Sequence, residues 1–445
     1  MKKILIGFLL IAFMMGSIFA QGQQAVPEAE TGELKGSIRF VSGETDPEQV
    51  EVHKEIVAEF ERLHPGVKIN FELTGFDDRE KKIIADLYAG VPTDVIQVDS
   101  ESAGLYAQEG ILMPLDDLVK DIGEDDFIEG ARLVVNDHDY AMPYSGANMM
   151  MYVRTDLLEA AGLEIPKTWE ELLAAVKVLT KGDTYGIVLP AGQNNATTLW
   201  LQVFINQAGG NVFNENLEPT LNTLEVIEAL TFYRDLAKYC PPGIASYGYG
   251  DVVNAFVSGK VAIAFYQGRI IQRVANDNPE IDKKYELVAY PTKDGLDLQF
   301  ASCVYYAIGK NCENPELAKA FLKYLTTEDR ALRVSMSAPG HMPPVLKSVQ
   351  VLADTYNNPF VQSHLDKIKF SFQHASNGFN EAVNAGGVKG DYYVRNGIIN
   401  PYYAYVRQYN VLSKMVQKVV LENQDPAQVA AEGQKELSDI IANNK

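Results

Sequence analysis

Acidic and hydroxyl side chains follow two predicted strands directly, in the loops 42–45 and 99–102. Their polar members are Ser42, Glu44, Thr45, Asp99, Ser100 and Glu101. Ionised carboxylates accept paired hydrogen bonds from neighbouring hydroxyl groups, and the loops at the carboxyl ends of parallel strands are where such sheets bind ligands. This arrangement favours recognition of a hydroxyl-rich ligand; the alternatives are an exposed turn at 42–45 and a helix cap at 99–102.

Aromatic side chains are the second group suited to recognition. Trp200 lies in the segment 198–202, and Tyr249 and Tyr266 lie in or beside glycine-containing loops. A flat ring can pack on the C–H face of a sugar ring while the hydroxyl groups remain free to hydrogen-bond. The alternative for Trp200 is a buried helix position, and Trp169 is predicted to pack in a core.

The sequence lacks the motifs of common catalytic sites. It contains no His-Glu-x-x-His, phosphate-binding Gly-rich Lys loop, Gly-x-Ser-x-Gly elbow or calcium loop. Gly248 and Gly250 do not begin a dinucleotide-binding fingerprint, because Val253 occupies the third glycine position. The six histidines are scattered, and no Cys/His cluster could hold zinc. We therefore expect neither a metal nor a cofactor.

The elements that would position these groups alternate between strands and helices. The predicted strands are 38–41, 67–73 and 94–98, and helices are predicted around 56–63 and 83–90. An alternating order of this length indicates a parallel sheet covered by helices.

Two helix starts are well marked. Thr168 and Glu171 form a capping box, in which the Thr168 hydroxyl accepts from the Glu171 backbone N–H and the Glu171 carboxylate reaches back. Asn314 is the expected N-cap of a helix that begins at Pro315. The C-terminal segment from Pro401 is predicted to form two helices.

The N-terminus has the features of a secretory signal peptide. Lys2 and Lys3 precede the apolar segment 4–13, and Ala20 supplies a small residue for cleavage. Residues 1–20 are predicted to be removed on export, and residues 21–35 to form a flexible leader. The mature protein is then periplasmic or otherwise extracytoplasmic; an uncleaved anchor is the alternative.

The composition limits which kinds of molecule the protein can bind. A net charge of −20 argues against nucleic acid and disfavours a multiply anionic ligand. The 445 residues exceed what one hydrophobic core usually organises, so two or more α/β domains are expected. Cys303 and Cys312 are the nearest candidates for a disulfide bond, and free thiols are the alternative.

One segment has the form of a family signature. From Met150 the chain runs Met-Met-Tyr-Val-Arg-Thr-Asp-Leu-Leu-Glu-Ala-Ala-Gly-Leu, followed by Glu-Ile-Pro-Lys-Thr-Trp-Glu-Glu-Leu. It resembles the extracellular solute-binding proteins of bacterial ABC importers, in the maltose-binding branch. Segments 89–95, 107–115, 256–268 and 314–325 resemble further motifs of that family, in the family's order, so the resemblance runs from Ser37 to the C-terminus.

The resemblance implies a periplasmic-binding-protein-like α/β fold, with two α/β lobes joined by a crossover hinge and a ligand cleft between them. It implies a non-enzymatic, monomeric protein that captures a mono- to oligosaccharide. The implied partner is the membrane permease of an ABC transporter. The expected N-lobe comprises residues 36–143 and 287–334, and the C-lobe comprises residues 144–286 and 335–445.

Position in the family motifs adds further candidate ligand contacts. They are Tyr144, Asn148, Trp200, Tyr249, Asp251, Tyr266, Gln267, Arg269, Gly340, His341 and Tyr402. Arg269 stands where the family has an aromatic residue, which would pass stacking to Tyr266. Val98 stands where the maltose-binding branch has a tryptophan, which argues against a maltodextrin.

Two alternatives stay open. The same fold could bind a polyamine, a peptide or a glycerol-phosphate-type ligand, and an acidic cleft would suit a polyamine. A secreted glycoside hydrolase is the enzyme alternative, since it needs only two carboxylates about 5–10 Å apart and the sequence has 59 acidic residues.

Overall fold

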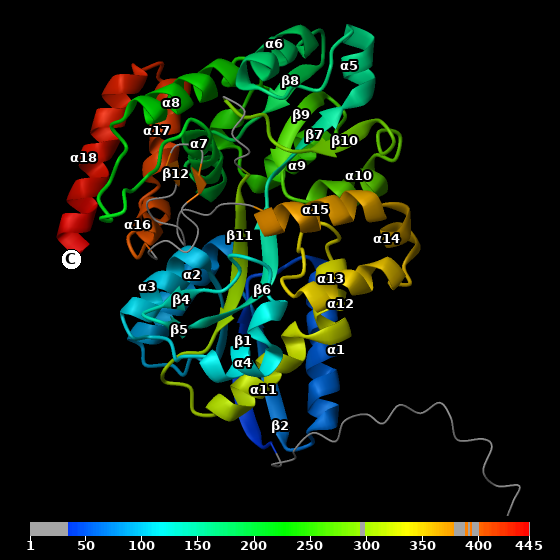
Figure 1. Ribbon diagram of the computed structural model, residues 1–445, viewed down its shortest axis with the longest axis vertical. Coiled ribbons are helices and arrows are strands. Elements are labelled where there is room, and N and C mark those ends of the chain that lie inside the picture. Colours follow the sequence, from blue (N-terminus) through cyan, green and yellow to red (C-terminus); the bar gives the residue numbers. More distant parts are fainter. Residues whose placement is uncertain (1–33, 294–298, 378–387, 390–391, 394–399, 445) are drawn as a thin grey trace, which may run out of the picture.

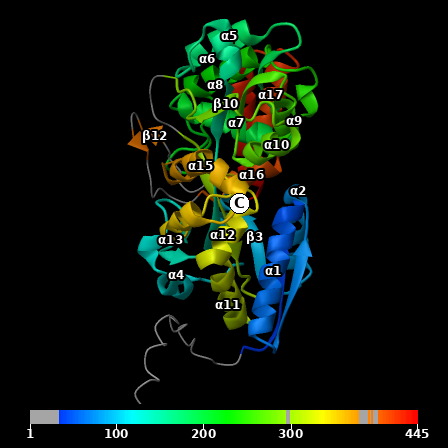
Figure 2. The same cartoon turned by 90° about the vertical axis from the view of Figure 1, so that its right-hand side faces the viewer.

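The computed structural model describes residues 34–293, 299–377, 388–389, 392–393 and 400–444. Two sheets lie one above the other, each covered by helices (Figure 1). Figure 2 shows the same two bodies from the side, with α15 (Leu365–Asn377) and α16 (Tyr403–Gln408) at the level where they meet. The predicted signal peptide, residues 1–20, and most of the predicted leader lie outside the described residues.

The first sheet has the strand order β2-β1-β3-β11-β6. Its strands are β1 (Gly36–Ser42), β2 (Val67–Leu73), β3 (Val95–Asp99), β6 (Ala141–Asn148) and β11 (Ala301–Ala307). β1 pairs in parallel with both β2 and β3, as the alternating pattern predicts, while β11 runs antiparallel between β3 and β6. The carboxyl ends of β1 and β3 therefore meet at one edge. The loop 42–45 lies there, whereas the predicted loop 99–102 is replaced by the end of β3 at Asp99 and the start of α3 at Ser100.

The second sheet has the order β10-β7-β9-β8. Its strands are β7 (Met150–Arg154), β8 (Tyr185–Val188), β9 (Val261–Tyr266) and β10 (Tyr285–Val288). β6 and β7 are separated only by Met149, so the chain crosses from the first sheet to the second there. It returns between β10 and β11. Two further two-residue pairs are β4 (Val134–Val135) with β5 (His138–Asp139), and β12 (Val388–Lys389) with β13 (Tyr392–Tyr393).

Helices cover both sheets. Those with the first sheet are α1 (Pro47–Leu63), α2 (Phe76–Tyr88), α3 (Ser100–Gln108), α4 (Asp116–Ile122), α11 (Pro315–Thr326), α12 (Glu328–Met336), α13 (Lys347–Gln350), α14 (Pro359–Ser363) and α15. Those with the second are α5 (Thr155–Ala161), α6 (Trp169–Leu179), α7 (Asn195–Gln207), α8 (Leu224–Ala237), α9 (Tyr249–Val257), α10 (Arg269–Asp277), α16, α17 (Val411–Val420) and α18 (Pro426–Asn444). Short 3-10 helices occupy Glu124–Asp126, Ile244–Ser246 and Val351–Thr355.

Each sheet has its own hydrophobic core. Phe40, Phe60 and Phe321 pack edge to face in the first, and Trp169 stacks on Phe232 in the second with ring centroids 4.1 Å apart. The predicted packing role of Trp169 is therefore confirmed. The expected lobe boundaries stay a prediction, and the cores differ from them in three places: Tyr144 and the buried residues of 336–372 join the first core, while Tyr290 and Phe300 join the second.

The predictions of individual helix starts and helix numbers were confirmed in part. The capping box of Thr168 and Glu171 is confirmed, with the Glu171 N–H donating to the Thr168 hydroxyl at 3.2 Å. Asn314 is the N-cap residue of the helix that begins at Pro315, as predicted, but its side chain makes no cap hydrogen bond and its amide instead donates to the Ser37 carbonyl of β1 at 3.1 Å. The C-terminal segment forms three helices where two were expected, because Asn410 takes a left-handed conformation with φ 55° and separates α16 from α17.

The three cysteines are free thiols, so no disulfide joins Cys303 and Cys312. Cys303 lies buried in β11, and burial raises the pKa of its thiol to about 12. A thiol with so high a pKa is a poor nucleophile. The alternative of unpaired cysteines is thus confirmed.

Candidate ligand-binding site

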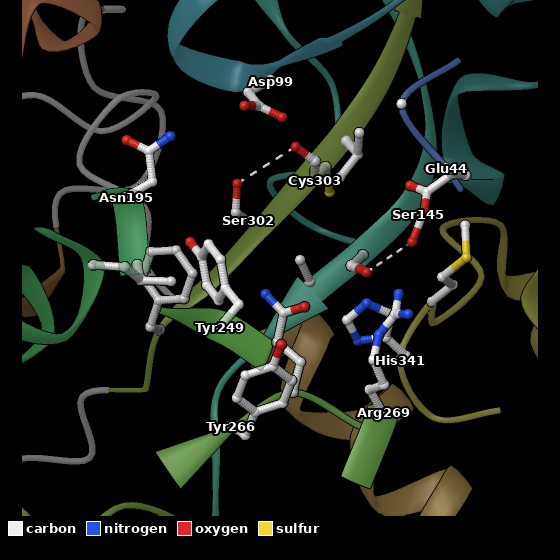
Figure 3. A pocket seen from close by; sticks show the side chains of 18 of the residues that line it. Glu44, Asp99, Ser145, Asn195, Tyr249, Tyr266, Arg269, Ser302, Cys303 and His341 are labelled. Carbon is white, nitrogen blue, oxygen red and sulfur yellow. Dashed lines mark hydrogen bonds between the residues drawn. The ribbon is translucent and has the colours of Figure 1, made fainter. Parts of the chain in front are cut away.

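A cavity of about 430 Å³ lies between the two sheets. Its lining comes from the loop after β1, from the end of β3 and the first turn of α3, from β6 and β11, and from α7, α9, α10 and α16 of the second lobe. Figure 3 shows labelled side chains of both lobes around this space, with Glu44 and Asp99 on the first and Tyr249, Tyr266 and Arg269 on the second. Small-molecule pockets commonly have volumes of about 300–1,000 Å³.

The carboxylate of Glu44 is held on the first-lobe wall by three neutral donors. Gln49 donates to one oxygen at 3.0 Å, while Gln97 and the Tyr144 hydroxyl donate to the other at 2.9 and 3.0 Å. The Gln97 carbonyl in turn accepts from the Ser42 hydroxyl at 3.2 Å. Ser42 and Tyr144 therefore fix Glu44 from behind and do not border the cavity.

A buried ionic network forms the adjoining wall. Asp99 pairs with Arg79 of α2 at 2.8 Å and with Arg407 of α16 at 3.0 Å. The same Arg407 nitrogen lies 3.0 Å from a Glu101 oxygen, which also accepts from the Ser100 hydroxyl at 3.2 Å. Arg407 belongs to a helix packed in the second core, so this network joins the lobes across the cavity.

The network sets the charge states of its members. Burial works to raise the pKa of Asp99, but Arg79 and Arg407 outweigh it and hold the pKa below its usual range. Burial works to lower the pKa of Arg407, but Glu101 and Asp99 raise it well above its ordinary value. Glu80, buried beside Arg79, has a pKa raised by burial. Asp99 is therefore ionised and already fully paired.

Helix α7 supplies a polar face on the opposite wall. Asn195, Thr198, Leu199 and Gln202 border the cavity, and their i, i+3, i+4, i+7 spacing places them along one side of the helix. The Thr198 hydroxyl and the Gln202 amide nitrogen are buried and have no hydrogen-bond partner among the residues that the structure describes. Buried polar groups are normally paired, so these two are ready to bind a ligand's oxygens.

Two tyrosine rings line the second-lobe wall. Tyr266 at the end of β9 and Tyr249 at the start of α9 both border the cavity, with ring centroids 6.3 Å apart. Trp200 lies behind them, 1% exposed, with its ring 5.9 Å from Tyr249 and 6.1 Å from Tyr266. The stacking role expected of Trp200 is not supported, because its position on α7 turns the indole into the core.

A close backbone approach brings α10 to the cavity. A Cβ on Gly268 would lie 1.9 Å from the backbone of Gly340. The two backbone segments are therefore in direct contact, and position 268 has no room for a side chain. Arg269, which follows, forms an ion pair with Asp46 of the first lobe. His341 borders the cavity beside it, and burial together with Arg269 lowers the pKa of His341 well below its usual value, which leaves the imidazole neutral.

The cavity gathers part of the predicted set. The members that border it are Glu44, Thr45, Asp99, Glu101, Tyr249, Tyr266, Gln267, Arg269 and His341. The members that do not are Ser42, Ser100, Tyr144, Asn148, Trp200, Asp251, Gly340 and Tyr402.

Several of the residues that do not border the cavity have structural partners instead. Asp251 caps α9, where its carboxylate accepts from the Gly248 N–H at 2.9 Å. Asn148 accepts a hydrogen bond from the Ser371 hydroxyl of α15 at 3.2 Å. Tyr402 immediately precedes Tyr403, and Tyr403 is the tyrosine that borders the cavity.

Other residues of the lining were not predicted from the sequence. Those with polar side chains are Asp46, Gln49, Ser145, Asn195, Thr198, Gln202, Arg273, Ser302, Tyr403 and Arg407. Asp46 directly follows the predicted loop 42–45, and Gln49 lies in the first turn of α1. The polar stripe of α7 was visible as helical spacing, whereas nothing local marks Arg407.

The described residues contain no cluster of three or more His, Cys, Asp or Glu side chains placed to hold a metal ion. Within the same residues, no helix combines the length and the apolarity that a membrane crossing requires. The lining can donate to and accept from hydroxyl groups and can pack against a ring face.

Comparison with known proteins agrees with this arrangement. A family model described as bacterial extracellular solute-binding protein matches residues 46–331. YcjN of Escherichia coli (strain K12), assigned by name to an ABC transporter as its periplasmic-binding protein, is 27% identical over 343 residues, 75% of this chain and 79% of YcjN. The mannitol-binding protein of Pseudomonas aeruginosa is 30% identical over 216 residues, 46% of this chain and 49% of that protein.

A solved structure has the same architecture. The ABC transporter solute-binding protein of Agrobacterium radiobacter K84, in complex with ribitol, superposes with a TM-score of 0.76 at 23% identity and covers 92% of this chain and 99% of its own. At this identity the likeness concerns the fold, and it confirms the expected two-lobe α/β class.

Proposed function

This chain belongs to the bacterial extracellular solute-binding protein family, and on that premise we propose that it captures a sugar or sugar alcohol between its lobes for the permease of an ABC transporter. One observation carries the proposal: a cavity lined from both lobes in which the Thr198 hydroxyl and the Gln202 amide nitrogen lack partners among the described residues. The fixed carboxylate of Glu44 lies on the other lobe. A polyhydroxylated ligand supplies both donors and acceptors for such a lining.

Size and ring content support a small ligand. About 430 Å³ is near the lower end of the range for small-molecule pockets, and Tyr249 and Tyr266 form a short aromatic surface, not an extended track. A mono- or disaccharide or a hexitol suits this space better than a long oligosaccharide. A relative named for mannitol binding, and a structural neighbour holding ribitol, support the inclusion of sugar alcohols.

We further propose that the ligand is bound and not chemically changed. A glycoside hydrolase needs one carboxylic acid with a raised pKa beside a second carboxylate. The pKa of Asp99 is lowered by its arginines. Glu80, whose pKa is raised, lies outside the cavity lining and accepts from the Tyr106 hydroxyl at 3.1 Å.

Export and lobe boundaries belong to the same proposal. Cleavage after Ala20 would release the mature chain outside the cytoplasm, and the mass of exported protein tests this directly. On the core clusters, we place residues 36–148 and 301–372 in the first lobe and 149–293 and 400–444 in the second. Limited closure of these bodies about Met149 would enclose the ligand.

A thermal-shift screen tests the proposal. Hexoses, disaccharides, hexitols and pentitols are added singly to the purified mature protein, with putrescine and a tripeptide as the alternatives. A ligand that binds only the native state raises the melting temperature, so a sugar or sugar alcohol should do so and should be recovered unaltered. A shift with putrescine or the peptide alone, or recovery of hydrolysed sugar, would refute the proposal.

A further inference from the structure

Apart from Glu44, the charged side chains that border the cavity form ion pairs with one another or with a neighbouring residue. At one end, Asp99 and Glu101 share the guanidinium of Arg407, with each oxygen 3.0 Å from the same nitrogen. Asp99 has a second partner in Arg79 at 2.8 Å. These carboxylates and this guanidinium therefore enter the cavity already paired.

The same holds on α10. Arg269 pairs with Asp46 of the facing lobe. Arg273, one turn further along, lies 2.7 Å from Asp277 and is about half exposed. An anionic ligand reaching either arginine would have to displace a carboxylate that the protein itself supplies.

Glu44 and His341 are the remaining ionisable side chains considered in the cavity lining. The three donors to Glu44 are neutral, and its charge interacts with the nearby Arg269. Its bound oxygens leave little acceptor capacity, which one ligand hydroxyl could fill. His341 borders the cavity as a neutral imidazole and offers no cation.

We propose that this internally paired lining restricts the cavity to uncharged polyhydroxylated ligands and rejects sugar acids and amino sugars of the same size. The inference rests on the proposed function and adds the ligand's charge class. A carboxylate or ammonium entering the cavity loses its water and finds the counter-charges engaged by ion pairs or, at Glu44, by three hydrogen-bond donors, and burying a charge without a partner is costly. Hydroxyl groups meet no such cost, because unpaired donors and acceptors are available to them.

The first experiment titrates the wild-type protein by calorimetry with sugars that differ only in charge. Each set contains a hexose, its hexuronate and its 2-amino sugar, in the gluco, galacto and manno series, with mannitol beside gluconate. In any series whose neutral member binds, the charged members should bind more than tenfold weaker. A uronate or amino sugar within tenfold of its neutral partner overturns the inference but leaves the proposed function standing. If no neutral sugar or sugar alcohol binds, either in these series or in the thermal-shift panel, the proposed function fails, and the inference fails with it.

The second experiment releases one arginine. Asp46→Asn leaves Arg269 without its carboxylate, so the affinity ratio of uronate to hexose should rise more than fivefold over wild type. Asp439→Asn is the control: it removes the carboxylate of an exposed ion pair with Lys435 on α18, outside the cavity lining, and should not change the ratio. Melting curves establish that both variants fold. A smaller rise in Asp46→Asn, or an equal rise in the control, would contradict the proposal.

Discussion

Replacing Gln202 with leucine should move ligand affinity and protein stability in opposite directions. The Gln202 side chain is 3% exposed, and its amide nitrogen has no hydrogen-bond partner among the described residues. An unpaired buried donor costs about 1–3 kcal/mol. Gln202→Leu keeps the approximate volume and removes that donor, so the free energy of unfolding of the unliganded protein should rise by about 1 kcal/mol.

The same change removes a ligand contact. A hydrogen bond between neutral partners contributes about 0.5–1.5 kcal/mol, which corresponds to a roughly 2- to 12-fold loss of affinity. Calorimetry with the tightest-binding neutral sugar measures the loss, and urea unfolding without ligand measures the gain. Gln207→Leu is the control, because it makes the same change on α7 outside the cavity, where Gln207 accepts from the Trp169 indole at 3.0 Å. Its ligand affinity should match wild type.

Two results would refute this reasoning. Wild-type affinity in Gln202→Leu would mean that α7 does not contact the ligand. A loss of stability greater than about 1 kcal/mol would mean that the amide nitrogen is satisfied in solution, for instance by ordered water. Either result would remove the polar face of α7 from the account of the site.

Three further predictions concern lobe contact, ring stacking and pH. Arg407→Gln leaves Glu101 without its ion-pair partner, so the free energy of unfolding should fall by about 1.5–3 kcal/mol; unchanged urea unfolding would contradict the paired geometry. Tyr249→Ala should weaken every bound sugar by a similar factor, roughly 2- to 12-fold, and calorimetry that shows loss for one epimer alone would argue against stacking. Burial lowers the pKa of His53, so the folded state keeps it neutral while the unfolded chain binds a proton below about pH 6.5. The stability that a neutral His53 contributes is therefore present above that pH and lost as the pH falls, by up to about 1.4 kcal/mol per pH unit. Urea unfolding at several pH values should show a smaller dependence of the unfolding free energy on pH in His53→Gln than in wild type. An equal dependence in the two proteins would contradict this prediction.

The first-lobe loops could be predicted because their signals are local. Strands at 38–41 and 94–98 follow from short apolar runs, and a parallel sheet brings their carboxyl ends to one edge. Glu44 and Asp99 therefore appear on the cavity wall as expected. The strand pattern does not predict which acidic side chain forms an ion pair. The ion pair of Asp99 depends on Arg407, which lies 308 residues further along the chain.

The second-lobe wall was predicted less well, because the sequence does not show which side of α7 faces the cavity. Trp200 was selected for its residue type, yet its position on α7 places it in the core, while Thr198 and Gln202 face the cavity. The polar residues at helical spacing in this otherwise apolar helix could have predicted that this side of α7 lines the cavity. Arg407 had none, since a single arginine in a C-terminal helix does not indicate which lobe it faces.

The most direct test of the central claim is calorimetry of wild type and Glu44→Gln with the neutral sugar or sugar alcohol that binds best. The account predicts one ligand per chain in wild type, with a Kd in the micromolar range or tighter, or about −8 kcal/mol. Hydrogen bonds to a charged group contribute about 1.5–3 kcal/mol, so Glu44→Gln should bind roughly 10- to 150-fold more weakly. Equal affinity in the two proteins, or no binding by wild type across the panel, would contradict the placement of the ligand between the lobes.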